Sequence, residues 1–155
     1  MYYFAYANLM DVDTMRGVAP SARMVSVACL RNYEFSFARC TDATKSGATL
    51  IPVEGAETWG VQYEMSDADM AALDKSAGIS EGNWAQMSVV VHDAGGAELP
   101  TTTYFIPNPS GRAGPPAYYV GPTLAGARAL DLPAEYLDKL TKLMTGVSTP
   151  AWPTN

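Results

Sequence analysis

The N-terminal stretch Tyr2-Tyr3-Phe4-Ala5-Tyr6-Ala7-Asn8-Leu9 joins an apolar, aromatic-rich run to a short polar step. Such a run is typical of a strand, because a handful of residues is far too short to span a bilayer. We therefore predict a buried strand over residues 2–6, followed by a tight loop. A loop of this kind can present free backbone N–H groups to an anion or an oxyanion. The loop is therefore either an anion-binding element or an ordinary turn.

Further short strands follow along the chain. Aliphatic and aromatic residues alternate with polar ones, or gather in short runs, in the segments 24–30, 33–38, 48–52, 58–65, 87–91 and 101–106. Arg31-Asn32 is typical of a hairpin turn, so we predict that the first two of these segments form a hairpin. Because strands outnumber helices and come as hairpins, the sequence predicts an α+β fold with a mainly antiparallel, barrel-like sheet.

Two helices are indicated by their caps and apolar stripes. Ser66 is suited to cap the first helix, and Asp69 stands at the reciprocal position of a capping box. Gly78 is placed to end this helix. The second helix is expected to begin at Pro133, to carry apolar residues at helical spacing, and to end at Gly146.

Length and composition limit the possible classes of protein. The chain has 155 residues, 48% hydrophobic and 17% charged, so we expect one domain over residues 1–146 and an extended tail over residues 147–155. A net charge of -6 without a basic run argues against nucleic acid or an anionic membrane as a partner. No apolar run approaches the roughly 18 residues of a membrane helix, and no signal-peptide pattern is present. We therefore expect a cytoplasmic protein.

The cysteines and the histidine do not indicate a metal centre. Cys29 and Cys40 both lie in or beside predicted strands, so we expect buried free thiols rather than a catalytic or bridged pair. His92 is the single histidine, and nothing else stands at ligand spacing from it. We expect a protein without a metal or a cofactor.

Several blocks of sequence fall in the order of a known family. They are Tyr3-Phe4-Ala5-Tyr6-Ala7-Asn8-Leu9, Val27-Ala28-Cys29-Leu30, Gly47-Ala48-Thr49-Leu50, Trp59-Gly60-Val61, Leu73-Asp74 and Leu132-Pro133-Ala134-Glu135-Tyr136. Together they resemble the γ-glutamylcyclotransferase-like family, which includes the AIG2-like proteins, over nearly the full length of the chain. The first block is similar to the family's opening Tyr-Phe-Ala-Tyr-Gly-Ser-Asn-Leu. The resemblance implies the fold of that family.

The resemblance also implies a reaction. In the family, the α-amine of a γ-glutamyl group attacks its own side-chain carbonyl, which releases an amine or amino acid and leaves 5-oxoproline. A general base must take a proton from the ammonium, because only the neutral amine is a nucleophile. Backbone donors must hold the carboxylate or the developing oxyanion. In the family the loop after the first strand supplies the donors, and a glutamate in the pattern Leu-Asp-x-x-Glu-Gly supplies the base.

Both parts are altered in this chain. Leu73-Asp74-Lys75-Ser76-Ala77-Gly78 has Ala77 where the resemblance implies the catalytic glutamate. Three explanations are open: a natural loss that leaves a non-catalytic binding protein, an engineered Glu→Ala change, or a base that has moved, with Glu81 as the nearest candidate. The loop over residues 6–9 is one residue shorter than in the family and has alanine in place of the glycine-serine pair. A missing glycine matters if that position needs a positive φ or a close approach to a ligand.

The resemblance implies further site residues and a substrate class. The substrate-binding candidates are Tyr6, Ala7, Asn8, Leu9, Trp84, Tyr104 and Tyr118. For the last two, core packing with a satisfied hydroxyl is the alternative. The Leu-Asp motif's aspartate, Asp74, is expected to form structural hydrogen bonds around the end of its helix.

The implied function is acyl transfer on a small γ-glutamyl-type amide, with a small-molecule substrate as the partner. Two alternatives remain open. One is a non-catalytic small-molecule-binding protein of the same fold. The other is a divergent enzyme that uses Glu81 on a different amide or ester. The sequence leaves the oligomeric state open, with a homodimer as one option.

Overall fold

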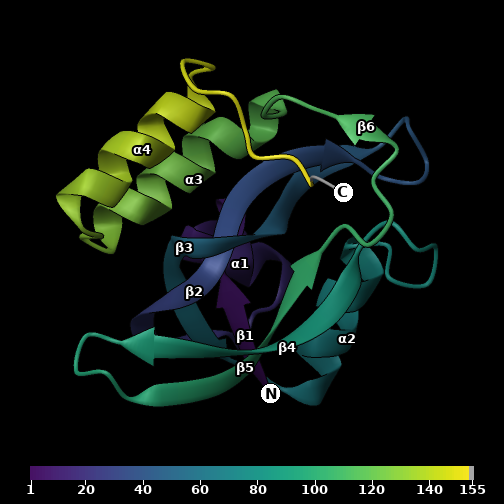
Figure 1. Cartoon of the computed structure of the whole chain (residues 1–155). Coiled ribbons are helices and arrows are strands. Elements are labelled where there is room, and N and C mark those ends of the chain that lie inside the picture. Colours follow the sequence, from purple (N-terminus) through teal and green to yellow (C-terminus); the bar gives the residue numbers. More distant parts are fainter. Residues whose placement is uncertain (154–155) are drawn as a thin grey trace.

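The strands close into a barrel-like sheet (Figure 1), and the computed structural model describes residues 1–153. Within these residues, five strands follow one another in the order β3-β1-β5-β4-β2, and β2 pairs back with β3. β1 runs parallel to β5, and the other neighbours are antiparallel. The strands are β1 (Tyr2–Ala5), β2 (Arg23–Arg39), β3 (Ser46–Glu64), β4 (Ala85–Asp93) and β5 (Glu98–Phe105). The predicted α+β fold with a mainly antiparallel, barrel-like sheet is confirmed.

The strands β2 and β3 are longer than the sequence predicts. β2 does not turn at Arg31-Asn32 but continues through it, and it pairs with β3 on both sides of this point. Asn32 has a φ of 67°, and its side-chain oxygen accepts a hydrogen bond of 2.9 Å from the N–H of Gly55 on β3. The predicted hairpin at Arg31-Asn32 is therefore wrong. Asn32 lies at a register shift in a continuous strand, where residues 53–56 of β3 bulge out opposite it, and the chain reverses at residues 40–45 instead.

Both predicted helices are present, as α2 (Asp67–Ser76) and α4 (Ala134–Met144). The side chain of Ser66 caps α2 by accepting a hydrogen bond from the N–H of Asp69. The reciprocal half of the capping box does not form, because the carboxylate of Asp69 accepts a hydrogen bond of 2.7 Å from the N–H of Ser21. Gly78 ends α2 with a φ of 65°.

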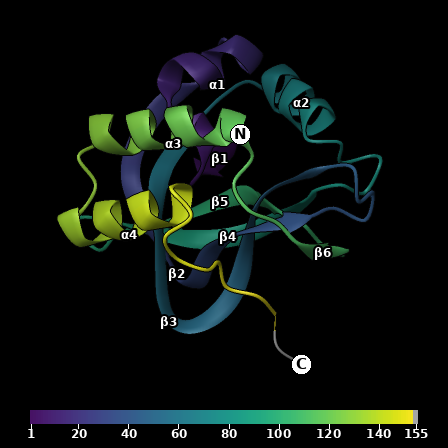
Figure 2. The same cartoon turned by 90° about the horizontal axis from the view of Figure 1, so that it is seen from above.

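Two further helices and two short elements are not predicted from the sequence. They are the 3-10 helix η1 (Asn8–Met10), α1 (Val12–Val18), α3 (Ala117–Ala129) and the short strand β6 (Gly111–Arg112). In Figure 2, α3 lies between α1 and α4 on one side of the barrel. Gly126 of α3 is buried against η1, where an added Cβ would lie 2.5 Å from the backbone N of Asp11. This close approach fixes α3 over the loop that follows β1.

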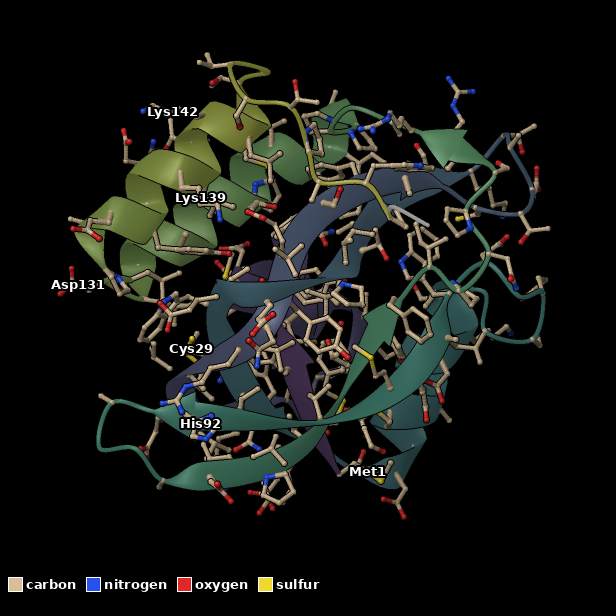
Figure 3. All side chains as sticks on the ribbon, viewed as in Figure 1. Met1, Cys29, His92, Asp131, Lys139 and Lys142 are labelled. Carbon is tan, nitrogen blue, oxygen red and sulfur yellow. The ribbon has the colours of Figure 1, made fainter. Side chains whose placement is uncertain are left out.

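The two cysteines are buried free thiols, as predicted. Cys29 on β2 and His92 on β4 are register partners on neighbouring strands, and both are labelled in Figure 3. The thiol of Cys29 donates a hydrogen bond of 3.4 Å to the carboxylate of Glu57. Within residues 1–153, no group of three or more His, Cys, Asp or Glu side chains is arranged to hold a metal ion.

The chain after α4 runs back across the barrel in Figure 1. The hydroxyl of Ser36 hydrogen-bonds to the carbonyl of Ala151, and the guanidinium of Arg112 lies 5.1 Å from the ring centre of Trp152. Trp152 also packs against a small buried cluster that contains Cys40 and Ile106. Residues 154–155 of the predicted tail lie outside the described residues. None of the helices that the structure describes is long and apolar enough to cross a membrane.

Candidate active site

A cavity of about 240 Å³ opens at the end of β1. It collects residues that are far apart in the sequence: the loop after β1, the last turn of α2, the start of β3, the end of β5 and the first turn of α3. The predicted site residues that line it are Tyr6, Ala7, Asn8, Leu9, Ala77, Trp84, Tyr104 and Tyr118. The fold therefore brings together every predicted site residue except Glu81.

The loop after β1 does not place Ala7 at a positive φ. Ala7 has a φ of -124°, so this position does not require the left-handed backbone that favours glycine. Asn8 and Leu9 begin η1, where the first N–H groups of a helix have no partner within it. Both residues line the cavity. The loop thus offers backbone donors at the cavity despite its shorter length.

Ala77 directly follows the last residue of α2 and is its C-cap. Its N–H donates to the carbonyl of Leu73 at 2.9 Å, and the chain then turns away through Gly78. The methyl group of Ala77 contributes only an apolar surface to the cavity wall. Glu81 lies outside the cavity lining, in the turn that follows, where its exposed carboxylate accepts a hydrogen bond of 3.0 Å from the hydroxyl of Ser80.

Tyr104 lines the cavity and hydrogen-bonds to a carboxylate that does not line it. The residue is 5% exposed, and its hydroxyl donates a hydrogen bond of 2.5 Å to Oδ1 of Asp74. Asp74 also accepts hydrogen bonds of 2.8 Å from the side-chain amide of Gln86 to both carboxylate oxygens. Burial, followed by the hydrogen bond to Asp74, raises the pKa of Tyr104 far above its ordinary value. Tyr104 is therefore held in its protonated form.

The two adjacent tyrosines of α3 have different positions. Tyr118 is 64% exposed and lies at the mouth of the cavity, whereas Tyr119 is 8% exposed and forms part of its wall. The ring of Tyr119 packs edge-on against Phe37 at 5.8 Å. The resemblance pointed to Tyr118 and missed Tyr119. Which of the two faces inward depends on the rotation of α3, and α3 itself was not predicted.

The cavity also contains residues that the sequence did not single out. These are Tyr3, Thr14, Ala48 and Ser76, together with Tyr119. The sequence does carry a signal for Tyr3, because it belongs to the aromatic strand that leads into the cavity loop. Tyr3 and Phe4 point to opposite faces of this strand, and both are buried. Thr14 and Ser76 are polar residues in helical segments, which carry no such signal.

Among residues 1–153, every side chain that lines the cavity is uncharged. Burial raises the pKa values of Tyr3, Tyr6 and Tyr119, so their hydroxyls stay protonated. The hydroxyl of Tyr6 donates a hydrogen bond of 2.8 Å to the carbonyl of Tyr104. The indole N–H of Trp84 donates one of 2.9 Å to the carbonyl of Ala48. The cavity is therefore suited to holding a small polar ligand by hydroxyl and backbone hydrogen bonds rather than by ion pairs.

Comparison with known proteins identifies the family. Residues 57–140 match the AIG2-like family. The chain is also 30% identical over 146 residues to a γ-glutamylcyclotransferase from Bos taurus, an alignment that covers 91% of this chain and 77% of that protein. The chain belongs to the AIG2-like, γ-glutamylcyclotransferase-like family.

Solved structures agree with this assignment of the AIG2-like chain. A γ-glutamyl cyclotransferase structure is 26% identical and superposes with a TM-score of 0.88, covering 100% of this chain and 92% of the other. An uncharacterized protein from Homo sapiens, loc79017, is also 26% identical, with a TM-score of 0.87 and coverage of 99% and 91%. The predicted resemblance is therefore confirmed at the level of family and fold.

Proposed function

We propose that this AIG2-like chain is an acyl-transfer enzyme that acts on a small γ-glutamyl amide. In the proposed reaction, the α-amine of the γ-glutamyl group attacks its own γ-carbonyl. The bond from that carbonyl to the leaving nitrogen breaks, and the products are 5-oxoproline and an amine or amino acid. The relationship to the bovine γ-glutamylcyclotransferase supports this reaction class.

The single observation that carries the proposal is the composition of the cavity. It combines the loop after β1, the end of α2 and several buried tyrosines in one uncharged pocket. The N–H groups at the start of η1 can hold the substrate's carboxylate or the developing oxyanion. The tyrosine hydroxyls can bind the amide and the amine. Such a site orients one end of a small molecule against the other, which is what an intramolecular attack requires.

The leaving group is expected to lie at the mouth of the cavity. Tyr118 is exposed there, and its ring lies 4.8 Å from that of Tyr119, which lines the wall. The face of an exposed aromatic ring can contact many different leaving groups. This contact does not select one of them through a buried polar group. We therefore expect strict recognition of the γ-glutamyl group and tolerance toward the released amine.

Mass spectrometry of the products tests the proposal. The purified chain is incubated with a panel of γ-glutamyl amides and γ-glutamyl amino acids, and with the matching α-glutamyl compounds as controls. Release of 5-oxoproline from γ-glutamyl compounds alone is the expected result. An absence of 5-oxoproline across the panel, with hydrolysis of some other amide or ester, contradicts the proposal and favours the divergent enzyme.

Ala77 favours a second candidate, a non-catalytic protein that binds the same class of small molecule. A methyl group cannot take a proton, so the chain lacks the base that the resemblance implies at this position. Isothermal titration with the γ-glutamyl panel separates the two candidates. Binding of an intact γ-glutamyl compound without turnover supports the binding protein, whereas turnover supports the enzyme.

A further inference from the structure

An enzyme of this kind needs a proton acceptor, and none of the described residues that line the cavity is charged. Two carboxylates contact the lining side chains from behind. Asp11 accepts a hydrogen bond of 2.6 Å from the hydroxyl of Thr14, but it also accepts one from the N–H of Thr14 and thereby caps α1. Asp74 accepts its hydrogen bond from the hydroxyl of Tyr104. Asp74 is therefore the carboxylate that is free of a capping role.

We propose that Tyr104 and Asp74 form a proton relay that serves as the general base in place of a side chain at position 77. In this relay, which rests on the proposed function, Tyr104 is the catalytic residue because it contacts the substrate. Asp74 is a positioning residue that accepts the proton of Tyr104. Glu81 takes no part in it.

The hydrogen-bond directions on Tyr104 fit this role. A phenol has one proton and two lone pairs, and the proton of Tyr104 is directed to Oδ1 of Asp74 at 2.5 Å. The lone pairs of the oxygen are thereby left for a donor in the cavity, such as the ammonium of a γ-glutamyl group. An uncharged tyrosine that is polarised by a carboxylate is a better acceptor than a tyrosine alone.

Three separate elements hold the relay in place. Asp74 lies on α2, Gln86 on β4 and Tyr104 on β5. Gln86 and Tyr104 are register partners on adjacent antiparallel strands. The amide of Gln86 donates to both oxygens of Asp74 at 2.8 Å, which fixes the plane of the carboxylate. This pair of hydrogen bonds orients the carboxylate toward the hydroxyl of Tyr104.

Every proton that the relay takes up is returned by the end of the reaction. The substrate ammonium gives a proton to the oxygen of Tyr104, and Tyr104 gives its own proton to Asp74. The neutral amine then attacks the γ-carbonyl, a C–N bond forms, and the C–N bond to the leaving group breaks. The attacking nitrogen loses a second proton as the ring closes, and the leaving nitrogen receives both protons. The relay ends as it began, with a neutral tyrosine and a carboxylate.

A concerted transfer also avoids a charged tyrosine. The titratable groups that face Tyr104 are Asp74 from α2 and Tyr3 from β1, whose ring centre lies 5.0 Å away. Burial and these neighbours raise the pKa of Tyr104, so a free tyrosinate is strongly disfavoured. Because Tyr104 gains one proton as it loses the other, no tyrosinate has to form.

Variants of both residues test the relay. Tyr104→Phe removes the hydroxyl, and Asp74→Asn removes the carboxylate charge while it keeps the shape of the side chain. The matched controls are Tyr2→Phe, on the exposed side of β1, and Asp67→Asn, in the exposed first turn of α2. A fifth variant carries Ala77→Glu alone, which provides a carboxylate at the cavity by another route, and a sixth combines Ala77→Glu with Asp74→Asn. Release of 5-oxoproline and the melting temperature are measured for each, and kcat/KM is followed against pH.

The relay predicts a loss of about 100-fold or more in kcat/KM for Tyr104→Phe and Asp74→Asn, as expected for general base catalysis. The controls keep the rate of the parent chain. The combined variant regains turnover, and its pH profile differs from that of the parent because a different carboxylate must be ionised. A merely structural role for Asp74 predicts no such recovery.

Other outcomes overturn the relay in distinguishable ways. Turnover by Asp74→Asn and Tyr104→Phe at the rate of the controls shows that neither residue acts in catalysis. Turnover by the single Ala77→Glu variant, with none by the parent chain, removes the relay but leaves the proposed function of the cavity. If no variant releases 5-oxoproline, Ala77→Glu included, the proposed function is overturned. The relay, which rests on that function, is then overturned as well.

Discussion

The hydroxyl of Tyr119 lies 2.5 Å from the point that a Cβ atom would occupy on Gly47. The ring of Trp84 lies 2.6 Å from the same point. Both side chains line the cavity, one from α3 and the other from the segment before β4. Gly47 at the start of β3 is therefore the residue that lets these two aromatic rings meet at the cavity wall.

Gly47→Ala is expected to reduce activity more than it reduces stability. The added methyl group must displace Tyr119 or Trp84, and both can move only by shifting the cavity wall. We expect kcat/KM to fall about 10-fold or more, with a loss of about 1–3 kcal/mol in the free energy of unfolding. Kinetics and urea unfolding measure the two effects. Gly95→Ala, where the nearest contact of an added Cβ is an ordinary 3.5 Å, is the control, and equal behaviour of the two variants contradicts the prediction.

Gly126→Ala is expected to separate α3 from the loop after β1. Its Cβ would lie 2.5 Å from the backbone of both Met10 and Asp11, and a backbone cannot rotate away as a side chain can. We expect a loss of roughly 3 kcal/mol in the free energy of unfolding, at the upper end of overpacking effects. The control is Gly121→Ala in the same helix, where an added Cβ meets open space and alanine favours the helix by about 1 kcal/mol. Thermal unfolding of both variants measures the difference. A Gly126→Ala variant as stable as the parent chain contradicts the prediction.

Tyr119→Phe and Tyr118→Phe form a matched pair that separates the two adjacent tyrosines. Tyr119 is buried in the wall and Tyr118 is exposed at the mouth. If the hydroxyl of Tyr119 binds the γ-glutamyl group, its removal costs one hydrogen bond, or about 1 kcal/mol, and raises KM about 5-fold. Tyr118→Phe leaves KM for the same substrate nearly unchanged. A larger effect at Tyr118 than at Tyr119 contradicts this assignment.

The stability of the fold is expected to fall in alkaline solution. Burial, followed by the hydrogen bond to Glu57, raises the pKa of the Cys29 thiol from 9.0 to about 12. Burial also raises the pKa values of Tyr63 and Tyr136. Since the unfolded chain releases these protons first, the folded state loses stability as the pH rises from about 9 toward 12.

Urea unfolding at a series of pH values measures this alkaline loss. Cys29→Ala removes one of the titrating groups, so its stability is expected to decline less steeply over the same pH interval. A parent chain whose free energy of unfolding stays constant from about pH 9 to 11 contradicts the interpretation.

The sequence predicts those elements whose local signals agree with their tertiary environment. α4 has a regular apolar stripe, and Tyr136, Leu140 and Leu143 are buried as the spacing requires. α3 was missed because Gly121 and Pro122 interrupt it with residues of low helix propensity. Its position depends instead on the packing of Gly126 against η1, which a local pattern does not contain.

The site was predicted only in part, for a similar reason. The loop after β1 and Ala77 are contiguous motifs, so the resemblance found both. The sequence predicts only a structural role for Asp74, because its contact with Tyr104 joins residues 30 positions apart across a helix and a strand. Asn32 shows the same limit in the fold. Arg31-Asn32 is typical of a turn, but β2 continues through it, and the N–H of Gly55 in the bulge of β3 donates to the Asn32 side chain.

The central claim is that this chain, with Ala77 in place, catalyses an intramolecular attack. The most direct test is turnover of a γ-glutamyl amide by the chain in water labelled with oxygen-18. Intramolecular attack by the amine predicts unlabelled 5-oxoproline and an equimolar amount of released amine. Oxygen-18-labelled glutamate shows hydrolysis instead and contradicts the claim, as does intact substrate after prolonged incubation.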